Sequence, residues 1–135
     1  MKILFLGGTG VISTACTRLA VARGLDVTLL NRSSRDGIPG TRQITADITR
    51  TAEAATALAG KTWDAVVDFI AFDRASVEQR LELFRGRTAQ YVFISTTSAY
   101  QKPAAHHLLT ESTPLANPFW EYSRLKIAAE DRLQL

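Results

Sequence analysis

A run of apolar residues followed at once by a glycine-rich turn is the feature that most restricts how this chain can fold. Residues 3–6 are Ile-Leu-Phe-Leu, and Gly7-Gly8-Thr9-Gly10 follow them directly. The pattern predicts a buried strand, a tight turn and the start of a helix, in which Ser13 stands where a third glycine is usual and is still small enough for close packing. Gly7 permits the sharp turn, and Gly10 lets a pyrophosphate approach the backbone at the helix N-terminus. The turn therefore predicts a dinucleotide-binding unit.

Apolar strands alternate with helical patterns along the rest of the chain. Continuous apolar strands separated by helices are typical of a parallel sheet that is covered on both faces. We expect an α/β fold with a doubly wound parallel sheet (Rossmann), in the order 3-2-1-4-5 and truncated before a sixth strand. The expected strands cover about 3–6, 27–30, 43–45, 65–70 and 91–94, and the expected helices about 12–22, 51–58, 77–84 and 118 to the end.

Helical spacing also predicts which side chains face the sheet. The expected apolar stripes are Ile12, Ala15, Leu19 and Ala22 in the first helix, and Val77, Leu81 and Phe84 in the third. The single cysteine, Cys16, is expected as a small core residue of the first helix. One cysteine cannot form an internal disulfide, which suits a reducing cytosol, so we expect a cytoplasmic protein.

The length and the net charge of the chain limit the domain organisation and the kinds of function that can be expected. The 135 residues are expected to form one dinucleotide-binding domain, 1–135, which is small for an enzyme of this type. The net charge of +3 is spread without a dense basic run, so nucleic-acid binding is not expected. No apolar run approaches the length of a membrane span, so membrane insertion is not expected either. Because the chain ends at Leu135 in or just after a helix, we expect an N-terminal fragment that lacks the C-terminal substrate region and is inactive alone.

Several ordered motifs together resemble one enzyme family. The chain is similar to the N-terminal part of an extended short-chain dehydrogenase/reductase of the NAD-dependent epimerase/dehydratase family, which includes UDP-galactose 4-epimerase. The resemblance covers essentially all of the chain. It rests on Gly7-Gly8-Thr9-Gly10, Ala46-Asp47-Ile48, the segment Phe93–Tyr100, Glu111-x-x-Pro114-Leu115 and Tyr122-Ser123-x-x-Lys126-x-x-x-Glu130.

The resemblance implies three catalytic residues. Tyr122 and Lys126 are four residues apart and so share one face of a helix, where an ammonium favours the phenolate form of a tyrosine. The family pattern makes Tyr122 the acid/base on the substrate oxygen, and Lys126 a ligand of the nicotinamide ribose as well. Thr96, four residues before Tyr100, matches the family's serine or threonine, whose hydroxyl would bond to the reacting oxygen.

The same resemblance implies a set of cofactor-binding residues at the carboxyl ends of the strands. Asp47 matches the family position that contacts adenine, although an N-cap or turn role is compatible with the same residue. The implied set is Gly7, Thr9, Gly10, Val11, Ile12, Asn31, Arg32, Asp47, Ile48, Phe69, Ile70, Ala71 and Lys126.

The end of the second strand departs from the pattern of NAD-preferring relatives, which carry an acid there. This chain has Asn31 and Arg32, followed by Ser33, Ser34 and Arg35. No acid would repel a 2′-phosphate, and Arg32 could pair with one. The sequence therefore predicts NADP as the preferred cofactor, with NAD as the alternative.

We therefore expect an NAD(P)-dependent epimerase or oxidoreductase that transfers hydride to or from a small hydroxy or keto substrate, with a nucleotide sugar as one candidate. Thr97 and Ser98 stand where a dehydratase shows Asp-Glu, which favours an epimerase or a reductase. The alternative is a non-catalytic dinucleotide-sensing or RNA-associated member of the superfamily.

Adjacent His106 and His107 lack a third ligand at zinc spacing, so no metal is expected. The family also implies a homodimer, for which Leu125, Ala128, Ala129 and Arg132 are the expected contact face.

Overall fold

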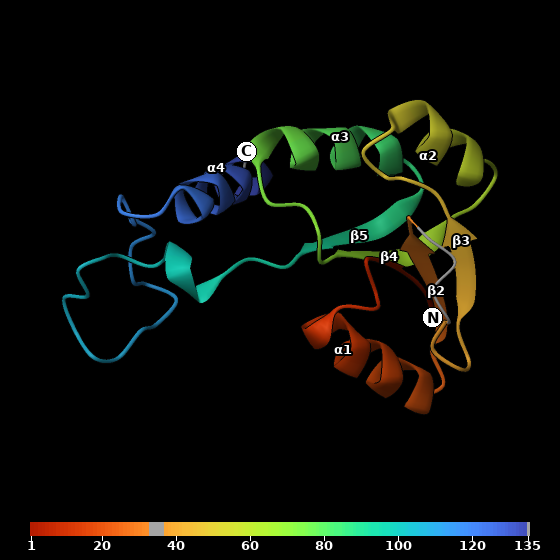
Figure 1. Ribbon diagram of the computed structural model, residues 1–135, viewed down its shortest axis with the longest axis horizontal. Helices are drawn as coiled ribbons and strands as arrows, with labels where there is room; N and C mark the ends of the chain where they lie inside the picture. Colours follow the sequence, from red (N-terminus) through yellow and green to blue (C-terminus); the bar gives the residue numbers. More distant parts are fainter. Residues whose placement is uncertain (33–36, 135) are drawn as a thin grey trace. The chain divides into compact units, whose positions relative to one another are not determined.

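The computed structural model describes residues 1–32 and 37–134 and contains a five-stranded sheet (Figure 1). The strands run parallel in the order β3-β2-β1-β4-β5, which confirms the expected topology. Leu6 pairs with both Leu30 and Asp68, so three strands end at one edge of the sheet. The bounds are β1 Lys2–Leu6, β2 Asp26–Asn31, β3 Arg42–Thr45, β4 Trp63–Asp68 and β5 Thr88–Phe93.

The chain divides into two compact units. The first is Met1–Ile70 with Leu81–Ile94 and holds the whole sheet; the second is Ala71–Arg80 with Ser95–Leu135. The helices are α1 Val11–Ala22 and α2 Thr51–Ala57 in the first unit, α3 Arg74–Phe84 shared by both, and the 3-10 turn η1 Thr97–Ala99 and α4 Glu121–Gln134 in the second. Among the described residues, no helix is both long and apolar enough to cross a membrane.

Alternate side chains of β1 enter two separate cores, because successive residues of a strand point to opposite faces of the sheet. Leu4 and Leu6 join the core on the α2 side, and Ile3 and Phe5 join the core on the α1 side. Figure 1 shows α1 and α2 on opposite faces of the sheet. This double covering explains why residues 3–6 of β1 are apolar without alternation.

The face of α1 that packs on the first unit is not the one the sequence predicts. Ser13, Thr17 and Ala20 are buried, whereas Leu19 of the expected stripe is 53% exposed. Ile12, Ala15 and Ala22 are also exposed, and Cys16 is exposed rather than part of the core. The reason is the short distance to the glycine turn: Thr17 donates from Oγ1 to the Gly8 carbonyl at 3.0 Å, and only small side chains fit there.

In the second unit, Asp73 caps the start of α3. Its carboxylate accepts the Ser76 N–H at 2.7 Å, and its carbonyl accepts the Val77 N–H at 3.2 Å. The hydrogen bonds from Ser76 hold the pKa of Asp73 below its ordinary value. The predicted apolar stripe of this helix is confirmed, since Val77 and Phe84 are buried and Leu81 is half-buried.

The segment between η1 and α4 is a long loop with a closed base. Tyr100 and Leu115 form an isolated antiparallel bridge, and the Gln101 N–H donates to the Pro114 carbonyl at 2.8 Å. The last helix begins at Glu121 rather than near residue 118. A turn precedes it, in which the side chain of Asn117 accepts the Phe119 N–H at 3.1 Å.

Two residues of the expected dimer face are engaged inside the second unit. Ala129 is completely buried, and Arg132 donates from Nε to the carboxylate of Glu78 at 3.1 Å. These two residues thus have partners within the second unit, and the homodimer stays a prediction. Leu125 and Ala128 remain half-buried.

Gly7 offers a direct test of the turn. It has φ +82°, and a Cβ there would lie 2.4 Å from Cγ2 of Ile70. We expect Gly7→Ala to lower the free energy of unfolding by about 2–4 kcal/mol, from the left-handed backbone and the overlap together. Urea unfolding measures this change.

The matched control is Gly24→Ala. Gly24 has φ +74°, but a Cβ there meets nothing within 4 Å. It should therefore cost only the backbone contribution, about 1–2 kcal/mol. Equal losses for the two variants would contradict the packing of Ile70 on the turn.

Candidate functional site

The glycine turn at the end of β1 is held by the first residues of α1. The Gly7 N–H donates to the Leu30 carbonyl at 3.1 Å, which ties the turn to β2. Ser13 donates from Oγ to the Gly7 carbonyl at 2.7 Å and accepts the Gly10 N–H at 2.8 Å. The residue that replaces the usual third glycine is thus buried and fixes both ends of the turn.

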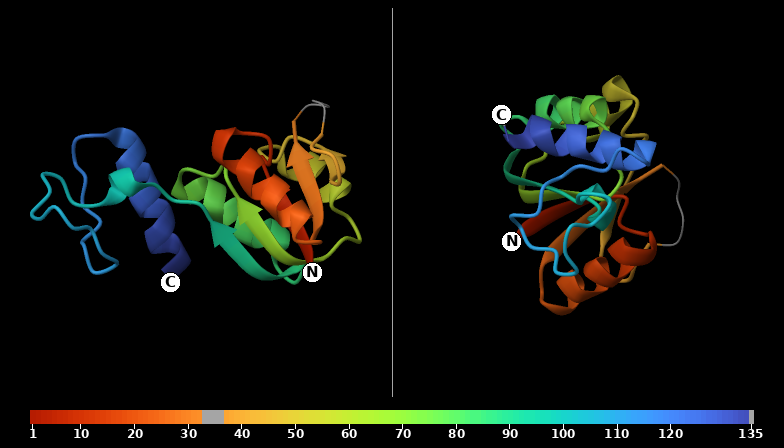
Figure 2. Two further views of the ribbon diagram at one scale, coloured as in Figure 1. Left: turned by 90° about the horizontal axis from the view of Figure 1, so that it is seen from below. Right: turned by 90° about the vertical axis from the view of Figure 1, so that its left-hand side faces the viewer.

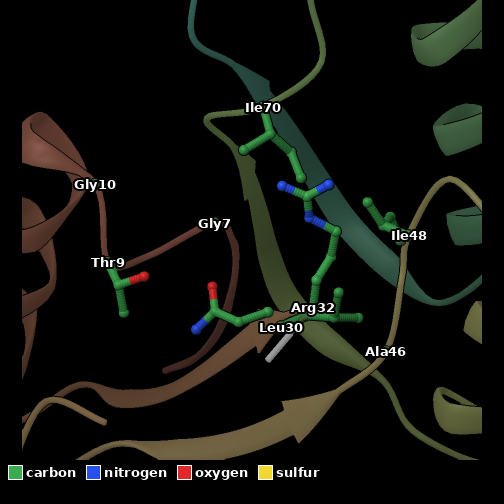
Figure 3. Close-up of a pocket in the computed structure, with 9 residues that line it drawn as sticks. Gly7, Thr9, Gly10, Leu30, Arg32, Ala46, Ile48 and Ile70 are labelled. Atoms are coloured by element: carbon green, nitrogen blue, oxygen red, sulfur yellow. The ribbon is translucent and has the colours of Figure 1, made fainter. Parts of the chain in front are cut away.

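A groove of about 280 Å³ opens above this turn (Figure 3). It lies at the carboxyl ends of the strands, where ligands bind in open α/β sheets. Seven of the predicted cofactor residues line it, and Leu30 and Ala46 join them without having been predicted. The lining residues are Gly7, Thr9, Gly10, Leu30, Asn31, Arg32, Ala46, Ile48 and Ile70.

Arg32 carries the only full charge among these nine residues. Figure 3 shows its side chain rising across the groove toward Ile70 and Ile48. Its charge is one of the smaller contributions that lower the pKa of Asp47. The predicted neighbours Ser33, Ser34 and Arg35 lie outside the described residues.

Other predicted cofactor residues lie beside the groove rather than in its lining. The carboxylate of Asp47 accepts the side chain and the N–H of Thr49, at 2.7 and 3.0 Å, and these bonds are the main reason that its pKa is lowered. Phe69 packs edge-on against Phe5, with ring centroids 5.3 Å apart. The turn role that the sequence left open for Asp47 is therefore present.

The start of α1 exposes two large apolar side chains next to the groove. Val11 is 97% exposed and Ile12 is 68% exposed. The first N–H groups of a helix have no partner within it, so this end can receive an anion. An apolar surface beside such N–H groups suits a ligand that carries both a pyrophosphate and flat rings.

Asp68 and Tyr91 support the groove, and sequence reasoning did not single them out. Asp68 is fully buried; its carboxylate accepts the Ile70 N–H at 2.8 Å and the Tyr91 hydroxyl at 2.9 Å. It thereby fixes Ile70, whose side chain covers Gly7. An acid directly after the apolar run Ala65-Val66-Val67, at the carboxyl end of the strand, was the available signal.

In the second unit, α4 presents the predicted tyrosine and lysine together. Lys126 is 3% exposed, and its Nζ donates to the Ala71 carbonyl at 2.8 Å. The same Nζ lies 6.0 Å from the centre of the Tyr122 ring. Trp120 packs on that ring with a centroid separation of 4.9 Å, a contact that the sequence did not predict.

Thr96 also belongs to the second unit and caps η1. Its Oγ1 lies 3.0 Å from Oγ of Ser98 and accepts the Ser98 N–H at 3.3 Å. Beside it, Ser95 donates to the carboxylate of Glu130 from α4. A hollow of about 270 Å³ adjoins these groups, lined by Ser95, Thr96, Thr97, Tyr100, Leu115 and Glu130.

The two histidines of the long loop lie apart from these groups. His106 and His107 are exposed, and their rings lie 4.2 Å apart. In the described part of the chain, no group of three or more His, Cys, Asp or Glu side chains is placed to hold a metal ion.

Comparison with known proteins identifies the family. The sequence profile of the NAD dependent epimerase/dehydratase family matches residues 3–134. The chain belongs to this family. The epimerase family protein SDR39U1 of Bos taurus is 36% identical over 122 residues, which is 82% of this chain and 36% of the bovine protein. This chain thus spans about a third of the length of that relative.

Solved structures share the fold of this epimerase-family chain. The UDP-Glc/GlcNAc 4-epimerase of Campylobacter jejuni has a TM-score of 0.83 at 21% identity, over 98% of this chain and 48% of that one. The UDP-glucose 4-epimerase of Bifidobacterium longum, solved in complex with NAD+ and UDP, has a TM-score of 0.82 at 19% identity, over 99% of this chain and 48% of that one. Family and fold together make this a dinucleotide-binding domain of the epimerase type.

Proposed function

We propose that the protein is an NAD(P)-dependent epimerase or reductase that transfers hydride to or from a hydroxy or keto carbon, with a nucleotide sugar as its substrate class. The observation that carries the proposal is the buried Lys126 ammonium beside the Tyr122 ring on α4. Lysine side chains are rarely this deeply buried, and an ammonium held next to a tyrosine suits acid/base chemistry at the phenol oxygen. The nucleotide sugar is suggested by the names of the structural neighbours.

The groove residues fit a dinucleotide. The turn at Gly7 and Gly10 and the start of α1 would hold the pyrophosphate, and Ile48 and Ile70 would pack against the adenosine end. In the second unit, Lys126 and the region of Ala71 would hold the nicotinamide ribose. When bound, the nicotinamide supplies the acceptor or donor of hydride.

Three side chains of the second unit would then handle the proton. The Lys126 ammonium stabilises negative charge on the Tyr122 oxygen by Coulomb attraction. That oxygen accepts the proton of a substrate hydroxyl, and in the reverse direction donates it to a carbonyl oxygen. The Thr96 hydroxyl donates a hydrogen bond to the same substrate oxygen.

The cofactor we propose as preferred is NADP. Arg32 provides a guanidinium in the groove, and none of the nine described lining residues is an acid that would repel a 2′-phosphate. We also propose a cytoplasmic homodimer, for which Leu125 and Ala128 remain as contact residues of α4.

Cofactor choice can be tested at Arg32. In the full-length protein, we expect tighter binding of NADPH than of NADH, and a reversed order in Arg32→Asp. The expected loss for NADPH is about 1.5–3 kcal/mol, the range for a hydrogen bond assisted by charge. Titration calorimetry measures both affinities.

Arg18→Asp is the matched control, because Arg18 is exposed on α1 and does not line the groove. It makes the same change of charge and should leave the ratio of the two affinities unchanged. Equal affinities in the wild type that stay equal in Arg32→Asp would overturn the assignment.

Catalysis can be tested at the tyrosine and lysine of α4. In the full-length protein, Tyr122→Phe should abolish turnover and leave cofactor affinity nearly intact, since it removes only the oxygen that moves the proton. Lys126→Ala should weaken both. Steady-state kinetics of UDP-galactose epimerisation and cofactor titration measure the two effects.

Lys102→Ala is the control, because Lys102 is exposed in the long loop. It should change neither quantity. Wild-type turnover in Tyr122→Phe would remove the catalytic role of this tyrosine. A wild-type protein that binds the cofactor without any turnover would favour the dinucleotide-sensing alternative.

A further inference from the structure

A continuous chain of side-chain hydrogen bonds runs from Asn117 to Thr96, entirely within the second unit. Nδ2 of Asn117 lies 3.3 Å from Oγ of Ser123, which donates to Oγ of Ser98 at 2.9 Å. Oγ of Ser98 lies 3.0 Å from Oγ1 of Thr96. Figure 2 shows η1, which carries Ser98, beside α4, which carries Ser123. The chain thus links the first turn of α4 to the proposed catalytic hydroxyl.

The backbone fixes which way the amide of Asn117 points. Its Oδ1 accepts the Phe119 N–H at 3.1 Å, and its Nδ2 donates to the Ser98 carbonyl at 2.7 Å. An amide nitrogen can only donate, so the Ser123 oxygen must accept the bond from Asn117. Asn117 is 7% exposed and Ser123 is fully buried, which favours direct bonds over bonds to water.

Each hydroxyl has a single proton to donate, so a bond that uses this proton leaves the oxygen only as an acceptor for its other partners. Ser123 uses its proton on Ser98. Ser98 accepts that bond, and its Oγ lies 3.0 Å from Oγ1 of Thr96, a contact in which either hydroxyl could be the donor. The Thr96 oxygen also accepts the Ser98 N–H at 3.3 Å. With Ser98 as the donor in that contact, two donors reach the Thr96 oxygen, and the Thr96 proton is available for a third group.

We propose that Asn117, Ser123 and Ser98 are positioning residues that orient the Thr96 hydroxyl as a hydrogen-bond donor to the substrate oxygen. The inference rests on the proposed function, which places Thr96 at that oxygen. Bonds that polarise one another in sequence also strengthen the last donor. If these hydrogen bonds only joined η1 to α4, it would not matter which hydroxyl donates in each of them.

Neutron diffraction from a deuterated crystal of the protein tests the direction without any substrate. We expect the deuterium on Ser98 Oγ to point at Thr96 Oγ1, and the deuterium on Thr96 to point away from Ser98. A deuterium on Thr96 Oγ1 directed at Ser98 Oγ overturns the proposal.

Kinetics test the consequence, with the full-length protein and UDP-galactose as the probe. Asn117→Asp replaces the donor by an acceptor of the same shape, and Ser98→Ala removes the last link. Each should lower kcat about tenfold or more with little change in KM or in NADPH affinity, since the hydrogen bond acts on the reacting oxygen. Ser123→Thr keeps the hydroxyl and should retain turnover where Ser123→Ala loses it.

Ser112→Ala is the matched control, because this exposed serine lies in the long loop, where its Oγ is 2.8 Å from Oγ1 of Thr110. It should leave kcat unchanged.

If Thr96→Ala loses turnover while Asn117→Asp and Ser98→Ala keep the wild-type kcat, the positioning role is overturned and the proposed function stands. If Thr96→Ala keeps the wild-type kcat, the role of Thr96 in the proposed function fails. If the wild type does not act on UDP-galactose, the nucleotide-sugar proposal fails and the neutron result decides on the direction of the bonds.

Discussion

The left-handed turn at Gly7 is the constraint on which the dinucleotide groove depends. Because a Cβ at this position would lie 2.4 Å from Ile70, only glycine allows the end of β4 to close over the end of β1. Ser13 holds the turn from the side of α1, and Asp68 holds Ile70 through its N–H. Tyr91 in turn donates to Asp68, so the wall of the groove is fixed by β1, α1, β4 and β5 together. A groove fixed in this way can receive a ligand without rearranging its backbone.

In the second unit, backbone groups hold two buried polar side chains. The Ala71 carbonyl holds Lys126, and the Ser98 carbonyl together with the Phe119 N–H orients Asn117. Backbone partners cannot rotate away as side chains can, so the directions of these bonds are set by the fold. Acid/base chemistry benefits from this arrangement, because donors that are already oriented need no reorganisation when charge develops.

The sheet order could be predicted because apolar strands and glycine turns are local signals, and most of the groove followed from the strand ends. The packed face of α1 could not be predicted from the sequence. Hydrophobicity favours Leu19 as a buried residue, whereas the short distance between α1 and the glycine turn selects the small side chains Ser13 and Thr17. The support of the groove by Asp68 joins residues 23 apart in the chain, and the bond from Asn117 to Ser98 joins residues 19 apart. No periodicity reports such pairs, since they depend on how the elements pack. The NADP preference and the catalytic roles stay predictions.

The central claim is that the groove above the glycine turn binds the dinucleotide. Titration of the full-length protein with NADP+, followed by backbone amide chemical shifts, tests it most directly. The account predicts that the largest shifts fall on Gly7, Thr9, Gly10, Asn31 and Ile70 and saturate together. Saturating NADP+ that leaves these amides unmoved, or shifts confined to the loop of residues 101–114, would contradict it.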